Sequence, residues 1–214
     1  YVLTPSKAIK NGNRKKERVR MTNVNKNVQN MVISALLCAV GIVIPMFAPK
    51  IVIGPMSFTL ASHVAIFIAM FISPVTTVAV CVVTSIGFVF AGLPFVVAAR
   101  AMTHIIFAFF GSIVLKKHPT LLYKPVPTGL FGFLCSVVHA AGEVVVVSVL
   151  YFGDSLSADM YASGYLMSVL LLVGVGTVVH SMVDFFISVF VWKPVSRIVT
   201  IPVSFRPERR SLSA

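Results

Sequence analysis

Three apolar segments of the chain each carry two ionisable residues four positions apart. The three pairs are Arg100 and His104, His139 and Glu143, and His180 and Asp184. Residues at this spacing lie on one face of an α-helix. An ionisable side chain at the centre of a membrane helix costs about 2.5–3.5 kcal/mol on insertion scales, so such faces turn away from lipid. The pattern predicts a polar site inside a helix bundle.

Two of these pairs have the chemistry to bind an anion. The guanidinium of Arg100 can pair with an anionic ligand or form a salt bridge with Glu143. The imidazoles of His104 and His139 can donate and accept, which suits an amide, a hydroxyl or a pyridine nitrogen. The alternative for both histidines is a hydrogen bond between helices.

The third pair is expected to lie apart from the other two. His180 and Asp184 are predicted toward the cytoplasmic half of their segment, whereas Arg100 is predicted near the external side of its own. A pair that fixes helix packing is the favoured interpretation, and a proton relay is the alternative. His63 is predicted near the outer start of its own segment, from where it can reach the same cavity as Arg100.

Other kinds of site lack support in the sequence. The histidines show no local metal-binding spacing such as His-x-x-x-His, so the sequence supports no metal site, and only one assembled from several segments in three dimensions stays open. The cysteines lie far apart within apolar segments, at positions 38, 81 and 135. Phosphate-binding, dinucleotide-binding and nucleophile-elbow motifs are missing from the sequence, which favours a non-enzyme without a cofactor of its own. An ATP-driven role would need a separate ATPase.

Composition predicts the elements that position these residues. The 214-residue chain is 57% hydrophobic and only 11% charged, against about 25% charged residues in soluble domains. We expect an all-α integral membrane protein, a compact bundle of six transmembrane helices. The predicted spans are 29–47, 58–73, 75–92, 94–115, 126–151 and 164–191.

The net charge of +12 is concentrated in three polar blocks. Eight of the 18 Lys and Arg residues precede residue 31, three lie within 116–124 and five follow the last span. This distribution follows the positive-inside rule, places both termini in the cytoplasm and argues against nucleic-acid binding. The predicted organisation is a basic, disordered arm (1–28), a membrane domain (29–192) and a basic tail (193–214). Residues 1–20 are suspected not to be native, with Met21 as the start.

Two further segments bear on function. The connection 48–57 is unusually apolar for a loop, and it is expected to be either a lid or a buried turn. The first span contains Ala35-x-x-x-Ala39, a spacing of small residues that lets another helix approach closely.

Together these features resemble the substrate-binding S component of energy-coupling factor (ECF) vitamin transporters. The resemblance covers residues 21–200 and rests on the basic six-span layout, the loop 48–57, the motif at Ala35 and Ala39, and the stretch 59–74. It implies a bacterial plasma-membrane protein that captures one vitamin from outside. It also implies docking, in part through Ala35 and Ala39, on a transmembrane T component that carries two ATPases using ATP and magnesium.

The residues narrow the class of vitamin. An arginine with histidines and one carboxylate suits an anionic, hydrogen-bonding ligand, and the predicted contacts are Arg100, His104, His139, Glu143 and His63. Pantothenate has a carboxylate, an amide and two hydroxyls and is ranked first. Niacin has a carboxylate and a ring nitrogen and is ranked second. The main alternative function is a stand-alone, proton-coupled carrier of small molecules, and the last is a membrane-embedded enzyme.

Overall fold

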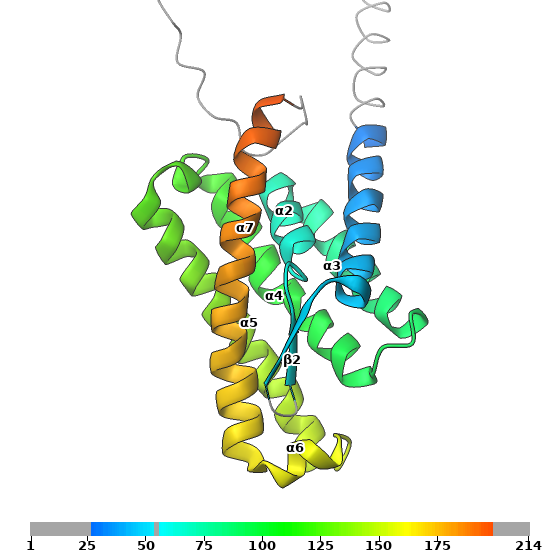
Figure 1. Ribbon diagram of the computed structural model, residues 1–214. Coiled ribbons are helices and arrows are strands. Elements are labelled where there is room, and N and C mark those ends of the chain that lie inside the picture. Colours follow the sequence, from blue (N-terminus) through cyan, green and yellow to red (C-terminus); the bar gives the residue numbers. More distant parts are fainter. Residues whose placement is uncertain (1–26, 54–55, 199–214) are drawn as a thin grey trace, which may run out of the picture.

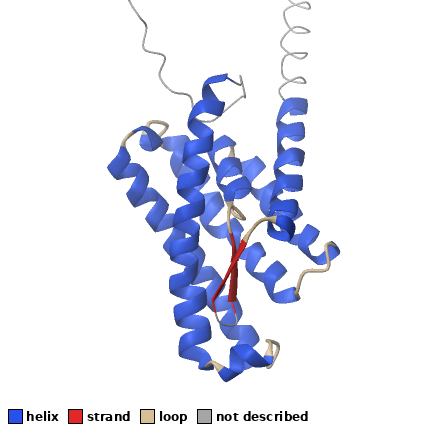
Figure 2. Ribbon diagram, viewed as in Figure 1, coloured by secondary structure: helices blue, strands red, loops and turns tan. Residues whose placement is uncertain are grey.

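The computed structural model describes residues 27–53 and 56–198. This part of the chain is a helical bundle with one two-stranded hairpin (Figure 2). Within it, four helices are long and apolar enough to cross a membrane: Asn27–Phe47, Phe95–Lys117, Pro125–Phe152 and Leu166–Ser196. A shorter apolar helix spans Pro74–Phe90. The architecture is that of an all-α, multi-pass membrane protein.

Most predicted spans coincide with helices. The matches are α3 (Pro74–Phe90), α4 (Phe95–Lys117) and α5 (Pro125–Phe152), each within two residues of its predicted bounds. The last helix begins as a π-helix, η2 (Leu166–Val175), and continues as α7 (Gly176–Ile198). It therefore extends beyond the predicted end of its span at residue 191.

The reversals between helices have local causes. Ser73 ends α2 (Val64–Ile72) in an extended conformation, and its Oγ accepts the backbone N–H of Thr76 at 3.1 Å. Pro74 then occupies the first turn of α3, where a missing N–H costs nothing. Gly92, between α3 and α4, has φ +74°, which glycine adopts without a steric penalty.

The predicted span 58–73 is wrong as a continuous helix. The chain instead forms an antiparallel hairpin of β1 (Lys50–Ile53) and β2 (Met56–Thr59), followed by a turn and α2. Nine residues of helix are about 14 Å long, well short of the roughly 30 Å hydrocarbon core. The predicted count of six membrane-spanning helices is therefore not confirmed.

Helix α2 lies inside the bundle, where it contacts α3, α4 and α7. Its Phe67 side chain is fully buried, with ring centroids 5.4 Å from Phe107 of α4 and 5.3 Å from Phe185 of α7. Non-helical backbone at membrane depth is tolerated only when protein surrounds it or it lines a cavity. The turn before α2 meets this requirement because it lies at the cavity described below.

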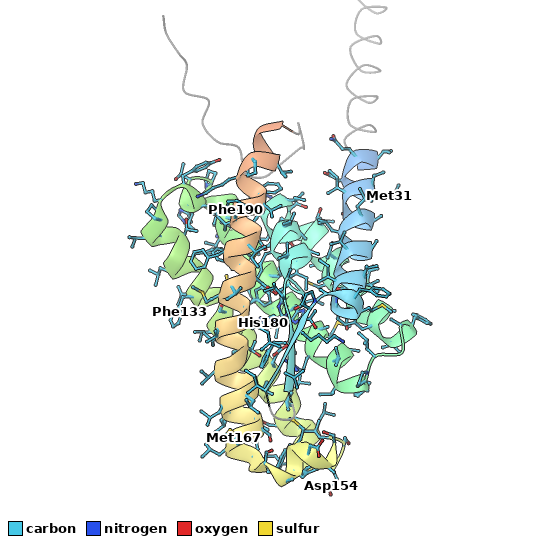
Figure 3. The ribbon with its side chains drawn as sticks, in the orientation of Figure 1. Met31, Phe133, Asp154, Met167, His180 and Phe190 are labelled. Carbon is cyan, nitrogen blue, oxygen red and sulfur yellow. The ribbon has the colours of Figure 1, made fainter. Side chains whose placement is uncertain are left out.

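The outer surface of the bundle is apolar, as expected for contact with lipid. Phe133 and Phe190 (Figure 3) are 47% and 80% exposed. The helix Asn27–Phe47 lies on the outside, and only 11% of its most apolar 18-residue stretch is buried. Its contact with the bundle is close, because a Cβ at Gly41 would lie 2.7 Å from Cγ2 of Thr84.

The described chain begins and ends at the same end of the bundle (Figure 1). The short helix α6 (Ala158–Ala162) and Asp154 lie at the opposite end (Figures 1 and 3). This arrangement agrees with termini on one side, and their cytoplasmic location stays a prediction. Most of the predicted arm and tail, including Met21, lies outside the described residues. Where those segments are described, residues 27–28 and 193–198 are helical, so the helices extend into both.

Candidate functional site

The centre of the site is an ion pair between α4 and α5. Arg100 Nη2 donates to Glu143 Oε2 at 2.8 Å. The hydroxyl of Thr177, on α7, donates to the same oxygen at 2.6 Å. Glu143 is only 2% exposed. These contacts link three helices at one buried carboxylate. Both are made to Oε2, so neither uses the second oxygen, Oε1.

Three imidazoles gather beside that second oxygen. The rings of His63, His104 and His139 meet edge to face, with centroids 4.6–4.9 Å apart. Glu143 Oε1 lies 3.4 Å from Nε2 of His139 and 3.7 Å from Nε2 of His104. The rings come from three separate elements: the turn before α2, α4 and α5. The ring of His139 also stacks on Phe107, which fixes its plane.

Asp184 attaches the last helix to this cluster. Its carboxylate accepts the backbone N–H groups of Ala61 and His63 at 2.8 and 2.9 Å. The ring Nδ1 of His63 lies 3.0 Å from the same carboxylate. Ser62 Oγ lies 3.0 Å from Nε2 of His180. Asp184 therefore positions both the turn that precedes α2 and the ring of His63.

The expected separation of His180 and Asp184 from the other pairs is wrong. The rings of His63 and His180 lie 5.0 Å apart, so one histidine links all three pairs. The reason is unequal helix length. Together η2 and α7 are longer than α4, so His180, near the middle of this combined helix, lies level with Arg100, near the start of α4.

A cavity of about 320 Å³ lies next to this cluster. The predicted residues His63, Arg100, His104 and Glu143 line it, and so does His180. His139 lies behind them, 1% exposed. Further lining residues, which the sequence analysis did not select, are Lys50, Phe58, Thr59, Ser62, Phe88 and Val97. The cavity thus has a polar inner wall and a partly aromatic outer wall.

The hairpin supplies part of the outer wall. Phe58 of β2 is 8% exposed, and its ring centroid is 5.6 Å from that of His180. This packing depends on a glycine, because a Cβ at Gly176 would lie 2.7 Å from Phe58 Cζ. The residues of β1 are exposed, which disagrees with a buried turn over residues 50–53 of the connection. That this loop is a lid stays a prediction, which rests on its apolar sequence.

Several buried nitrogens at the site have no hydrogen-bond partner among the described residues. They are Nε of Arg100, both ring nitrogens of His104 and Nε2 of His139. A buried polar group without a partner costs roughly 1–3 kcal/mol, so native proteins satisfy nearly all of them. These groups are available to a ligand or ion.

A potential metal-ligand set arises from the fold although the sequence spacing predicted none. Ligating atoms of His63, His104, His139 and Glu143 all lie within 4.8 Å of one another. A second, smaller group combines His63 with His180 and Asp184. Sequence spacing missed both because their members come from four segments of the chain.

The predicted docking residues are not part of this site. Ala35 and Ala39 are exposed on the helix Asn27–Phe47, among large apolar side chains. They contribute nothing to the cavity lining.

Comparison with known proteins identifies the family. The chain is 40% identical over 173 residues to the niacin transporter NiaX of Lactococcus lactis subsp. cremoris, which covers 80% of this chain and 77% of that protein. The chain belongs to the S components of ECF vitamin transporters. No family model matches it. No solved structure matches it either.

Membership of this family gives the site its context. ECF S components take up vitamins as membrane subunits and act together with a T component and ATPases. The chain is therefore a transport protein of the cell membrane rather than an enzyme. In such a subunit, a polar cavity inside the bundle is the natural place for a water-soluble ligand.

Proposed function

We propose that this S component captures niacin. The observation that carries the proposal is the cavity next to Arg100 in a chain 40% identical to a niacin transporter. Niacin is an aromatic ring with a carboxylate and a ring nitrogen. The cavity offers a cation, imidazoles and an aromatic wall, which match these three features one for one.

The carboxylate of niacin pairs with Arg100 in this proposal. Only Nη2 of Arg100 is used by Glu143, and its buried Nε has no partner among the described residues. A guanidinium has five N–H donors in a planar fork, so it can hold Glu143 and a second carboxylate together. Lys50, on the hairpin side of the cavity, adds a second positive charge.

The ring of niacin lies between the hairpin and the histidines in this proposal. Phe58 and Val97 offer apolar surface on which a planar ring can pack. The ring nitrogen is an acceptor and needs a donor, which His104 can supply because both of its nitrogens lack partners among the described residues.

Niacin replaces pantothenate as the first choice of vitamin. Pantothenate is a flexible chain whose hydroxyl and amide groups all need partners. The cavity combines polar side chains with the apolar side chains of Phe58, Phe88 and Val97. This combination suits a flat ring with polar substituents better, and the similar protein from Lactococcus lactis is a niacin transporter.

Capture by this chain is proposed to serve an ATP-driven complex. A T component docks on the exposed small residues Ala35 and Ala39, and two ATPases that use ATP and magnesium supply the energy. Small residues on a lipid-facing helix support this because they let a second helix approach closely. The ligand-binding and docking residues lie on separate parts of the chain.

One observation keeps the stand-alone, proton-coupled carrier as a second candidate. Glu143, His139, His63 and Asp184 form a series of buried acid and base groups. Glu143 Oε1 lies 3.4 Å from His139 Nε2, the rings of His139 and His63 have centroids 4.7 Å apart, and His63 Nδ1 lies 3.0 Å from the Asp184 carboxylate. Buried series of this kind serve as proton relays in transporters. Uptake of niacin into liposomes that hold this chain without any ATPase would favour the carrier.

Calorimetric titration tests the proposed ligand. The purified protein is titrated with niacin, with nicotinamide, which lacks the carboxylate, and with pantothenate. We expect niacin to bind at least about 100-fold more tightly than nicotinamide, because a site built around a charged partner rejects the analogue without it. Equal affinity for niacin and nicotinamide, or tighter binding of pantothenate, contradicts the proposal.

A further inference from the structure

We infer that His63, His104, His139 and Glu143 bind one divalent transition-metal ion of the zinc type. Their ligating atoms lie within 4.8 Å of one another, and all four residues are buried, from 1% to 8% exposed. Ligands around a tetrahedral zinc ion are separated by about 3.3 Å, from bond lengths of about 2.0–2.1 Å. The side chains therefore need to move by only about 1 Å to close around an ion.

Outer contacts already orient two of the three imidazoles. Nδ1 of His63 lies 3.0 Å from the Asp184 carboxylate, and Nδ1 of His139 lies 3.2 Å from Ser181 Oγ. Each contact occupies one ring nitrogen and leaves Nε2 for the ion. A metal-binding histidine characteristically holds a carboxylate or another polar group through its second nitrogen, which fixes its tautomer and orientation.

An ion also accounts for the polar groups that the protein leaves without partners. Nε2 of His139 and both nitrogens of His104 are buried and lack hydrogen-bond partners among the described residues. Their separations from Glu143 Oε1, 3.4 and 3.7 Å, exceed the length of a good hydrogen bond. One metal ion would satisfy Nε2 of His139, one ring nitrogen of His104 and the free carboxylate oxygen together.

The ligand set and the local charge suit a zinc-type ion. Three imidazoles and one carboxylate are preferred ligands of Zn²⁺, Co²⁺ and Ni²⁺. Around the cluster, Glu143 and Asp184 are two buried carboxylates, and Arg100 is the adjoining guanidinium. A divalent cation reverses the sign of this balance and so favours an anionic ligand.

The ion would also face the vitamin. His63, His104 and Glu143 line the cavity, so the side of the ion toward the cavity is the position for an added ligand. The carboxylate or ring nitrogen of niacin suits that position. This last step rests on the proposed function, whereas binding of the ion does not.

Metal titration of the purified protein tests the inference. The protein in detergent is stripped with a chelator, dialysed and titrated with Zn²⁺. Bound metal is measured by elemental analysis, and Co²⁺ is added separately to record its visible spectrum. We expect about one ion per chain and the absorption bands of a tetrahedral or five-coordinate Co²⁺ site.

Two ligand variants and two comparison variants identify the site. His104→Ala and His139→Ala are expected to weaken Zn²⁺ binding more than about 100-fold, since even outer-contact changes cost 10–100-fold. His118→Ala, an exposed histidine outside the cluster, is the matched control and keeps full affinity. His180→Ala also keeps it. Loss of the ion in His180→Ala, with binding retained in His104→Ala, would place the metal at His63, His180 and Asp184 and overturn the inference.

The outcomes for metal and for niacin are distinguishable. Failure of wild-type protein to bind Zn²⁺ or Co²⁺ more tightly than His104→Ala overturns the metal site, whatever niacin does. A metal site without niacin binding overturns the proposed vitamin and leaves the ion in place. Niacin affinity that falls in the stripped protein and returns on addition of Zn²⁺ supports both. Unchanged affinity in the stripped protein removes the ion from ligand binding.

Discussion

Asp184 holds His63 at two points, accepting its backbone N–H at 2.9 Å and contacting its ring Nδ1 at 3.0 Å. One buried side chain thus fixes both where α2 begins and which way the central imidazole faces. The carboxylate belongs to α7, 121 positions further along the chain. The turn before α2 therefore takes its conformation from a distant helix rather than from its own sequence.

Asp184→Asn should weaken this anchor without changing the size of the side chain. We expect a loss of about 1–3 kcal/mol in the free energy of unfolding, because a charge-assisted acceptor of several hydrogen bonds becomes neutral. Zn²⁺ affinity should fall about 10–100-fold, as for other outer contacts of metal-binding histidines. The measurements are denaturant unfolding in detergent and metal titration. Asp154→Asn, an exposed residue at the far end of the bundle, serves as the control and should behave like wild type.

Arg100 and Glu143 should be strongly coupled in stability. Arg100→Ala leaves a buried carboxylate without its cation, and we expect a loss of about 3–5 kcal/mol. Arg100→Ala combined with Glu143→Ala should lose much less than the two single variants added together. A double-mutant cycle measured by unfolding in detergent gives the coupling energy. Strictly additive losses would show that the pair seen at 2.8 Å contributes nothing to stability.

Gly176 should be essential for the wall of the cavity. Gly176→Ala introduces a Cβ 2.7 Å from the ring of Phe58, so the ring and β2 must shift. We expect niacin affinity to fall roughly tenfold, in line with an overpacking cost of about 1–3 kcal/mol. Gly129→Ala is the matched control, because a Cβ there meets no atom within 4 Å. Equal niacin affinity in the two variants, measured by calorimetry, would contradict the role given to Gly176.

Ala35→Trp and Ala39→Trp should separate docking from ligand binding. A bulky side chain on this exposed face prevents the close approach of a second helix. We expect assembly with the T component and niacin uptake to fail, while niacin binding to the isolated chain stays unchanged. Ala141→Trp, on an exposed face of α5, is the control for the size of the side chain. Co-purification of the complex and calorimetry on the isolated chain are the two measurements. Normal assembly of both variants would move the docking surface elsewhere.

The long helices and the importance of the ionisable pairs could be predicted from local pattern. Apolar runs of sufficient length and the punctuation at Pro74 and Gly92 predicted α3, α4 and α5 within two residues. The spacing of four placed each pair on one helix face. The salt bridge of Arg100 with Glu143, weighed as an alternative to ligand contact, is present.

The assembly of the pairs could not be predicted, because it depends on relative helix depth. Nothing near His180 indicates that η2 and α7 extend far enough to bring it level with Arg100. Thr177 and Ser181 look like ordinary small polar residues of a span, yet one donates to Glu143 and the other contacts His139. Such contacts are fixed by helix rotation, and a single sequence carries no signal of rotation.

The hairpin was missed for a different reason. Residues 56–59 and 64–72 are apolar enough to continue as one helix, and only tertiary contacts decide against it. Ala61 has φ +64°, a strained value for a residue with a side chain, and Asp184 holds its N–H. Asp184 of α7 stabilises this strained turn, so the local sequence did not predict it.

The short helix α2 is hydrophobic because it packs inside the protein, not because it faces lipid. Its residues Phe67, Ala69 and Phe71 are at most 1% exposed, so protein rather than lipid surrounds them. A hydropathy plot counts this stretch as a crossing, although its side chains are selected by shape against neighbouring rings. Substitutions in α2 should therefore follow the rules of a soluble core, where volume decides. An exchange such as Phe67→Leu, harmless on a lipid-facing helix, would open a void beside Phe107, the ring that stacks on His139.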